Sequence, residues 1–381
     1  MRFWKSCTTG VVMLALAAGG AQAQDDPNLQ VEKKNTGAGT TSAEFLLLGA
    51  GARGMALGPA FSAMTRDVES LYYNPASLSL MEGLEAGVTV MPYFADTRYL
   101  WAGVALPLAG GEYGFGLSIA NYGFSDAPVY TEVDQENESQ ITYNVSETVV
   151  GLSFAHSFID RFSGGFTLKL ISDKLGSASA FGAALDIGTN YHAELAGRPI
   201  SMAFLIQNLG TTLKHSGTGM EFDAIPTSPD PNFPVQGVDP VPARFQAQSS
   251  AIPVVFRVGV AYDVVSAATN RLTLGGEFNE HYNNSPAFGF SGEWAWTPAD
   301  LPVAAALRGS YAYQPDNNLS GEEERNYAGA TSVDDAGLDG LAVGGGLQFN
   351  ISDYQVRTDY AWRHFGVLGS RNVFSVNIGW R

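Results

Sequence analysis

One stretch decides the reading of this chain: Ser70-Leu71-Tyr72-Tyr73-Asn74-Pro75-Ala76-Ser77-Leu78. A Gly- and Ala-rich segment without a strand period precedes it, and one short alternating run after another follows it. Proline pushes the residue before it out of the helical region, so Asn74 is not expected inside a helix. We therefore expect Asn74-Pro75-Ala76 to form the hinge between an N-terminal plug and a β-barrel.

The composition is typical of a membrane barrel rather than a helical membrane protein. Of the 381 residues only 15% are charged, against about 25% in globular proteins. Gly and aromatic residues are abundant, and after the first 25 residues no uncharged apolar run reaches the length of a membrane-spanning helix. The formal net charge of -17 excludes the basic footprint of a nucleic-acid-binding protein.

The first 23 residues are typical of a signal peptide. Arg2 and Lys5 precede the apolar run 11–18, and Ala21-Gln22-Ala23 is a small-x-small cleavage site. The single cysteine, Cys7, lies within this segment, so the mature chain would have no disulfide. We expect removal of residues 1–23 and localisation in the outer membrane of a diderm (Gram-negative) bacterium.

The polar segment 24–36 is expected in the periplasm, and residues 37–83 are expected to form the plug. Glycines at close spacing in 49–58 predict tight turns, whereas residues 60–71 have a helix-like apolar spacing. The pattern Gly49-x-Gly51-x-x-Gly54 matches a dinucleotide fingerprint, but no alternating strand and helix surround it, which disfavours a nucleotide site. The sequence favours a compact segment that packs in or under the barrel.

Residues 84–381 show the period-2 alternation of an antiparallel transmembrane β-barrel, in which apolar lipid-facing residues alternate with lumen-facing ones. The predicted fold class is therefore all-β, with about fourteen strands and an N-terminal plug. The predicted strands are 85–94, 99–108, 112–122, 144–157, 163–173, 179–191, 200–208, 253–263, 271–280, 286–297, 302–313, 340–350, 354–363 and 372–381.

The longest predicted connections, 123–143, 209–252 and 314–339, all follow odd-numbered strands. Outer-membrane barrels have long external loops and short periplasmic turns, so this parity predicts that strand 1 runs outward. The first and last of these loops are rich in Asp and Glu and are interpreted as a solvated rim, since they lack the spacing of a calcium-binding loop.

Charges inside the predicted strands fall on the face opposite the apolar residues. A charge facing lipid at mid-depth costs about 2–4 kcal/mol, so these side chains are expected in the lumen. They form either a solvated lattice that rigidifies the wall or a substrate path: Lys169, Asp186, Arg257, Arg271, Glu277, Glu293, Arg308, Arg357 and Asp359.

The sequence offers no catalytic or metal constellation. The histidines, 156, 192, 215, 281 and 364, are scattered one per region, and no Cys or His cluster has zinc spacing. We expect no enzyme activity and no cofactor.

The plug motif resembles a known family. The run 51–63, then Asp67, then Leu71-Tyr72-Tyr73-Asn74-Pro75-Ala76-Ser77-Leu78, is similar to the PorV/PorQ branch of the FadL-like outer-membrane barrels. Departures are Pro59, Val68-Glu69 and the C-terminal Trp380-Arg381. The residues that carry the motif, with a structural or gating role, are Gly51, Arg53, Gly54, Gly58, Asp67, Asn74, Pro75 and Ala76.

The resemblance implies two alternative functions. PorV/PorQ proteins are accessory or shuttle subunits of type IX secretion and surface attachment, so the expected partners are secreted proteins with a C-terminal signal domain, or the translocon. FadL-like members admit hydrophobic small molecules, of the long-chain fatty acid type, by passive diffusion. The transporter reading predicts an apolar pocket beside the plug and a break in the wall, for which Gly114 and Gly116 are candidates.

Overall fold

The computed structural model describes residues 39–225, 239–314 and 340–380. The chain divides into units 1–34 and 35–381, and all described residues belong to the second. The predicted signal peptide, the segment 24–36 and most of the connection 314–339 lie outside the described residues.

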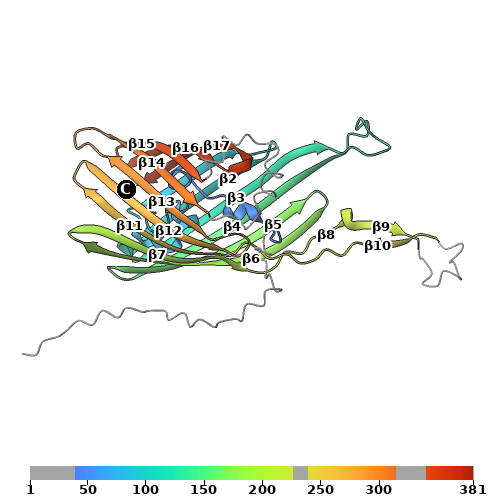
Figure 1. Ribbon diagram of the computed structural model, residues 1–381, viewed down its shortest axis with the longest axis horizontal. Helices are drawn as coiled ribbons and strands as arrows, with labels where there is room; N and C mark the ends of the chain where they lie inside the picture. The colour runs from blue at the N-terminus through green and yellow to red at the C-terminus, as the bar shows by residue number, and fades with distance from the viewer. Residues whose placement is uncertain (1–38, 226–238, 315–339, 381) are drawn as a thin grey trace, which may run out of the picture. The chain divides into compact units, whose positions relative to one another are not determined.

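Fourteen long strands of the described residues close into an antiparallel barrel, in which β1 pairs with β17 and β5 pairs with β6 (Figure 1). The even strand count predicted from the sequence is confirmed. The strands are β1 (Leu84–Pro92), β2 (Arg98–Leu108), β3 (Tyr113–Pro128), β4 (Thr142–Ile159), β5 (Phe162–Leu175), β6 (Ala178–Leu195), β7 (Arg198–Gly210), β11 (Val255–Ser266), β12 (Asn270–His281), β13 (Ala287–Trp296), β14 (Val303–Tyr313), β15 (Leu341–Ile351), β16 (Tyr354–His364) and β17 (Ser370–Trp380).

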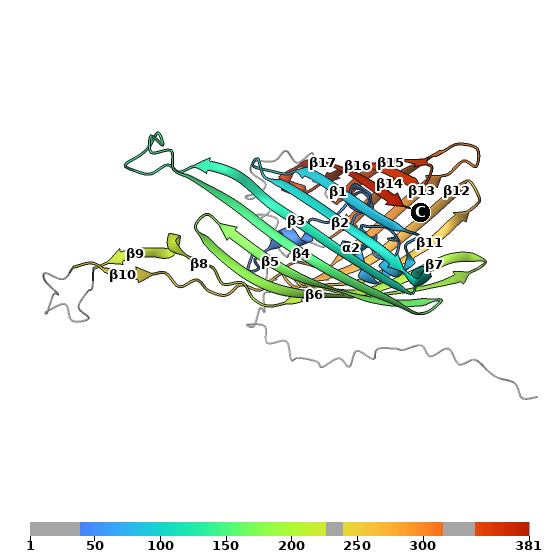
Figure 2. The same cartoon turned by 180° about the vertical axis from the view of Figure 1, so that it is seen from behind.

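The two ends of the barrel differ in their connections. Turns such as 160–161, 196–197 and 352–353 join strands at one end, which we call the short-turn end. The described parts of the connections 129–141, 211–254 and 314–340 lie at the other, the long-connection end. The connection after β7 carries a short β8 (Ser216–Gly217) and a hairpin of β9 (Glu221–Ala224) and β10 (Val241–Arg244), which the sequence reading missed (Figure 2).

The alternation in the strands sorts side chains as predicted. Leu117 of β3, Leu168 of β5 and Phe290 of β13 are 50%, 52% and 61% exposed on the outer surface. Their neighbours in sequence, including Thr167 and Ser291, are buried against the lumen. No helix of the described residues is long and apolar enough to cross a membrane.

Residues 39–83, which we call the plug, fill the lumen. They contain η1 (Glu44–Leu47), α1 (Ala52–Leu57), α2 (Ser70–Tyr73) and η2 (Pro75–Leu80). The main apolar core lies between the plug and the inner face of the wall, and includes Phe61, Val68, Leu71 and Leu78. The α1 helix packs on β13–β17, whereas η2 packs on β2–β6.

Two sequence predictions within the plug are wrong. Residues 60–71 do not form one helix: 58–69 is a chain of turns that follows α1, and only Ser70 and Leu71 are helical, as the start of α2. Its apolar residues are buried nonetheless, because walls on all sides of the lumen can bury a turn as well as a helix. Asn74-Pro75-Ala76 is not the boundary with the barrel either, since the plug continues through η2 and β1 begins at Leu84.

The plug runs along the lumen from one end of the barrel to the other. Near its start, the backbone N–H of Ser42 donates to the carbonyl of Ala251, and Asn283 donates to Thr41 and Glu44 at the long-connection end. Its last residues, Glu82 and Gly83, join β1 at the short-turn end. The plug therefore separates the two mouths of the barrel.

Candidate functional site: the plug, its ion network and two cavities

Two glycines with positive φ bound the α1 helix. Gly51 precedes it at φ 70° and Gly58 ends it at φ 57°, conformations that L side chains rarely adopt. A Cβ on Gly51 would also lie about 1.9 Å from the carboxyl carbon of Glu69. These glycines of the predicted motif let the chain turn tightly at both ends of the short helix Ala52–Leu57.

The start of α1 is tied to the wall by two hydroxyl groups. The N–H of Gly51 donates to Oγ1 of Thr89 on β1 (3.1 Å), and the N–H of Ala52 donates to Oγ of Ser375 on β17 (3.1 Å). Thr89 and Ser375 are direct partners across the β1–β17 ladder. The first helical N–H groups have no partner within a helix, so the wall supplies them.

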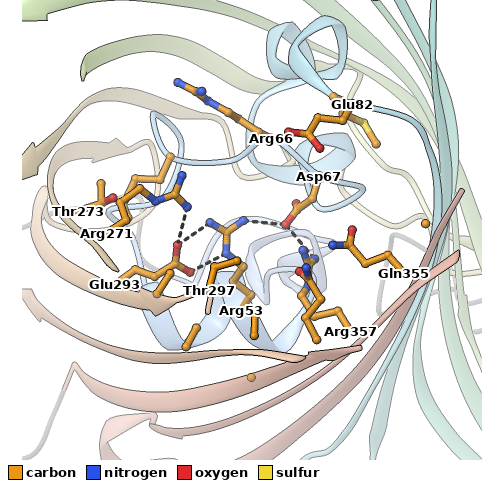
Figure 3. A pocket seen from close by; sticks show the side chains of 18 of the residues that line it. Arg53, Arg66, Asp67, Glu82, Arg271, Thr273, Glu293, Thr297, Gln355 and Arg357 are labelled. Carbon is orange, nitrogen blue, oxygen red and sulfur yellow. Dashed lines mark hydrogen bonds and ion pairs between the residues drawn. The ribbon is translucent and has the colours of Figure 1, made fainter. Parts of the chain in front are cut away.

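Arg53 is the centre of a buried ion network between plug and wall (Figure 3). Its guanidinium donates to both carboxylate oxygens of Glu293 (2.8 and 2.9 Å) and to Asp67 (2.7 Å). Arg308 donates to the same Glu293 (2.7 Å) and to Asp359 (2.5 Å). A two-pronged Arg–carboxylate contact fixes orientation as well as distance, so it holds α1 at one register on β13.

Arg357 extends the network on the other side of Asp67. It donates to Asp67 (2.8 Å) and to Asp359 (3.0 Å) and lies 3.3 Å from Glu85. The carboxylate of Glu69 accepts from the N–H of Gly54 (2.8 Å). The network, which we call the Arg53 network, thus links α1, the turn at Asp67, and strands β1, β13, β14 and β16.

Two smaller clusters of predicted lumen charges lie elsewhere, and the one at Glu277 also contacts the plug. Glu277 accepts from the N–H (3.0 Å) and the hydroxyl (2.5 Å) of Ser62, with Arg257 3.7 Å away. Lys169 pairs with Asp186 (2.6 Å) at a bulge between β6 and β7. The predicted lumen charges therefore face the interior, but they form three separate clusters and are mostly buried rather than solvated; Arg271, with 49% of its side chain exposed, is the main exception.

The Asn74-Pro75-Ala76 turn is a joint within the plug. Asn74 ends α2 with an extended backbone, and its side-chain oxygen accepts from the N–H of Ala76 (3.1 Å). Its amide donates to the carbonyls of Ser62 (3.2 Å) and of Thr189 on β6 (3.2 Å). One side chain thus caps the next helix and ties it to both plug and wall, because an Asn amide carries both donors and an acceptor.

Glycines in the wall make room for this turn. A Cβ on Gly165 of β5 would lie 2.7 Å from the backbone nitrogen of Ala76. Gly116 of β3 serves the same purpose for Leu71, whose side chain would lie 2.2 Å from an added Cβ.

The expected break in strand 3 is not present: β3 pairs continuously with β2 from Tyr113 to Gly123, and the glycines pack against the plug instead.

The sequence reading missed several residues of the interface. Glu85 lies in a strand whose lumen-facing parity was visible, so the alternation could have identified it. Ser62, Thr89 and Ser375 carry no such signal, because a small hydroxyl residue in a barrel strand or turn is common and its partner is distant in sequence.

A cavity of about 570 Å³ opens at the short-turn end, beneath the plug (Figure 3). Its lining contains five Arg and five Asp or Glu residues together with Ala, Leu, Met and Trp side chains. The Arg53 network forms part of its inner wall. Among the described residues, no group of three potential metal ligands occurs here or elsewhere.

A second, much smaller pocket lies on the long-connection side of the plug. Aromatic and aliphatic side chains of plug and wall surround a space of about 20 Å³, room for roughly one water molecule. Its lining is Phe45, Leu46, Leu71, Tyr72, Tyr99, Trp101, Ser118, Ala120, Val149, Gly151 and Lys169. We call it the aromatic pocket. The ammonium group of Lys169 in its lining is already paired with Asp186.

No protein-family model matches the sequence, and a search of curated proteins gives no match. Among solved structures, the CymD monoaromatic hydrocarbon channel is similar with a TM-score of 0.51 and 12% identity, over 88% of this chain and 98% of that one. The TodX deltaS2S3 mutant monoaromatic hydrocarbon channel gives 0.51 and 11%, over 87% and 98%. The Ralstonia pickettii toluene transporter TbuX gives 0.48 and 12%, over 88% and 100%.

The fold is that of the FadL-like outer-membrane barrels. At this level of identity the likeness concerns the fold, which CymD shares over nearly its whole length. The barrel fold that the resemblance of residues 51–78 implied is therefore confirmed, whereas none of these comparisons supports the PorV/PorQ branch.

Proposed function

We propose that this FadL-like barrel is a passive outer-membrane channel for small apolar compounds, with the long connections outside the cell. The aromatic pocket carries the proposal. Its lining includes Phe45 of the plug and Tyr99 and Trp101 of the wall, and aromatic side chains of this kind line the larger pockets in which proteins bind apolar ligands. The solved structures of similar fold named above are monoaromatic hydrocarbon channels, which favours the same class of compound.

The pocket is closed in this structure. A space for about one water molecule cannot hold an aromatic ring, and the residues that line this pocket are not those that line the larger cavity. Passage therefore requires the plug or its side chains to shift. The motif residues 51–76 bind the plug to the wall, so we assign them a gating role.

The secretion role implied by PorV/PorQ is the weaker alternative. It would need a surface for a folded partner, and the sequence resemblance of residues 51–78 is the observation behind it. The pocket and the fold comparison both favour the channel.

Uptake of labelled toluene by whole diderm cells tests the proposal, because their outer membrane is a barrier to apolar compounds. Cells that express the protein should take up toluene faster than cells with an empty vector. Ala120 is 4% exposed and faces the aromatic pocket, so Ala120→Phe should fill it and return uptake toward the vector rate.

Ala127→Phe, nearer the outer end of β3, is the matched control and should keep the parent rate. Both variants must show the heat-modifiable migration of a folded barrel. Equal uptake with the parent protein and the empty vector would refute the channel, and full uptake by a folded Ala120→Phe variant would refute the pocket as its route.

A further inference from the structure

Two of the arginines that line the 570 Å³ cavity at the short-turn end have N–H donors that are not engaged by carboxylates of the protein. The other three arginines in its lining, Arg53, Arg308 and Arg357, each make at least two contacts of 3.0 Å or less with carboxylates. Arg66 and Arg271 do not (Figure 3). A guanidinium has five N–H donors in a planar fork, so both retain donors for a ligand.

Arg66 lies in the turn segment of the plug and is exposed to the cavity. Its guanidinium donates a 3.3 Å hydrogen bond to the hydroxyl of Ser201 on β7. Within the described residues it has no carboxylate within 4.0 Å. Enclosure within the barrel lowers the pKa of Arg66, and the charge of Arg271 lowers it further, while Asp263 acts in the opposite direction. An anion between the two cations would relieve this repulsion.

Arg271 lies on β12 with 49% of its side chain exposed. Its carboxylate contact is to Glu293 at 3.7 Å, which is longer than a hydrogen bond. Glu293 already accepts three hydrogen bonds from Arg53 and Arg308, so it has little capacity left for Arg271. The guanidinium of Arg271 is therefore held near the network without being part of it.

Polar groups around the two arginines complete the lining of this corner. Ser201, Asp263 and Thr273 belong to this lining, whereas His192 on β6, the ladder partner of Ser201, does not. Asp263 on β11 supplies a carboxylate that interacts electrostatically with Arg66, and it accepts a hydrogen bond from the hydroxyl of Thr273 (2.6 Å). A hydrogen-bonded carboxylate on one side limits how much negative charge a ligand can bring.

We propose that Arg66 and Arg271 bind the carboxylate of a small organic monoanion at the short-turn mouth. A planar carboxylate matches the guanidinium fork, and two guanidiniums can share its oxygens. The cavity contains equal numbers of Arg and acidic residues, so a monoanion suits it better than a phosphate dianion. Apolar lining such as Met64, Leu80 and Ala305 suits the organic part of the ligand. The site does not depend on the proposed channel function.

Titration calorimetry of the purified full-length barrel in detergent, at low ionic strength, tests this site. The probes are benzoate and benzamide, which have the same ring with and without the charge. Benzoate should bind and benzamide should bind at least about tenfold more weakly. The double variant R66Q/R271Q should lose at least about tenfold in benzoate affinity, which corresponds to about 1.4 kcal/mol.

Arg244→Gln in β10 is the matched control, since it removes one exposed guanidinium in the connection between β7 and β11, at the opposite end of the barrel, and it should bind benzoate as the parent does. If the double variant does not fold, Arg66→Gln alone should weaken binding and Arg66→Lys should restore part of it. Absent benzoate binding, equal binding of benzamide, or unchanged affinity in a folded Arg66→Gln variant would overturn the site. Tighter binding of inorganic phosphate than of benzoate would overturn the ligand class.

Discussion

At the scale of single residues, the Arg53 network has more carboxyl groups than guanidinium groups. Arg53, Arg308 and Arg357 face Asp67, Glu69, Glu85, Glu293 and Asp359. Such an excess cannot all be ionised in a buried site. Glu69 is fully buried and its Oε1 has no hydrogen-bond partner, which makes it the group most easily kept neutral.

The two plug carboxyls respond to the site in opposite directions. Burial raises the pKa of Glu69 well above its ordinary value, and the charge of Asp67 raises it further. Burial alone would raise the pKa of Asp67 as well, but Arg357 and Arg53 together hold it below its ordinary value. Glu69 therefore stabilises the fold when protonated, and Asp67 does so when ionised.

These directions predict a pH dependence that substitutions can separate. The contribution of Glu69 is complete below its unfolded pKa of about 4.3 and is lost as pH rises toward its raised folded pKa. The contribution of Asp67 is present above about pH 3.9 and is lost as pH falls. Glu69→Gln should therefore cost little at pH 7 and reduce the loss of stability between pH 5 and 8, whereas Asp67→Asn should cost about 3–5 kcal/mol at pH 7.

Urea unfolding in detergent at pH 5 and pH 8 measures both effects, with Asp160→Asn in an exposed turn as the control. Equal destabilisation by Glu69→Gln and Asp67→Asn at pH 7 would show that Glu69 is ionised in the folded protein.

The lumen side of the charged residues was predictable from the sequence, whereas their partners were not. Arg308 and Glu293 had to point inward, because their strands alternate and lipid excludes charge. The pairing of Arg53 with Glu293 joins positions 240 residues apart. It depends on where the plug lies in the lumen, and no local pattern encodes that position.

At the scale of elements, the plug is shaped by the wall rather than by its own propensity. All fourteen strands were predicted, since a period of two persists over ten or more residues, but some ends were wrong: the third strand was predicted as 112–122, whereas β3 is Tyr113–Pro128. The apolar spacing in 60–71 suggested a helix, but contacts with the wall and within the plug determine the conformation of this segment. Ser62 binds Glu277, and Asp67 binds two arginines. Short elements inside a barrel are poorly predicted because every direction is buried.

The fit of the Asn74 turn on β5 leads to a further prediction. Gly165→Ala should displace the turn, because its Cβ would lie 2.7 Å from backbone atoms of Pro75 and Ala76. Overpacking of this kind costs about 1–3 kcal/mol. We expect a higher single-channel conductance in planar bilayers, since a displaced plug leaves the lumen open.

Gly276→Ala on β12 is the matched control, because the nearest atom to its added Cβ is 3.9 Å away. If Gly165→Ala and Gly276→Ala conduct alike, the contact between β5 and the turn does not seat the plug.

At the scale of the whole molecule, the barrel is held in the membrane by its outer face. Phe290 is 61% exposed on β13, and an arginine on the lipid face costs up to about 2–4 kcal/mol. Phe290→Arg should therefore reduce insertion into lipid vesicles, as measured by the fraction of heat-modifiable protein. Phe222→Arg in the β9 hairpin makes the same chemical change away from the barrel strands and should insert normally. Equal insertion of the two variants would contradict the assigned orientation of β13.

The closing seam of the barrel has a consequence for how the protein is made. The plug is synthesised before any strand, yet the first N–H groups of α1 are received by Thr89 on the first strand and Ser375 on the last. These two acceptors face each other only once β1 and β17 have paired. The plug therefore cannot complete its docking during synthesis. Its last contacts form only after the barrel has closed, so assembly of the wall and docking of the plug end in a single step.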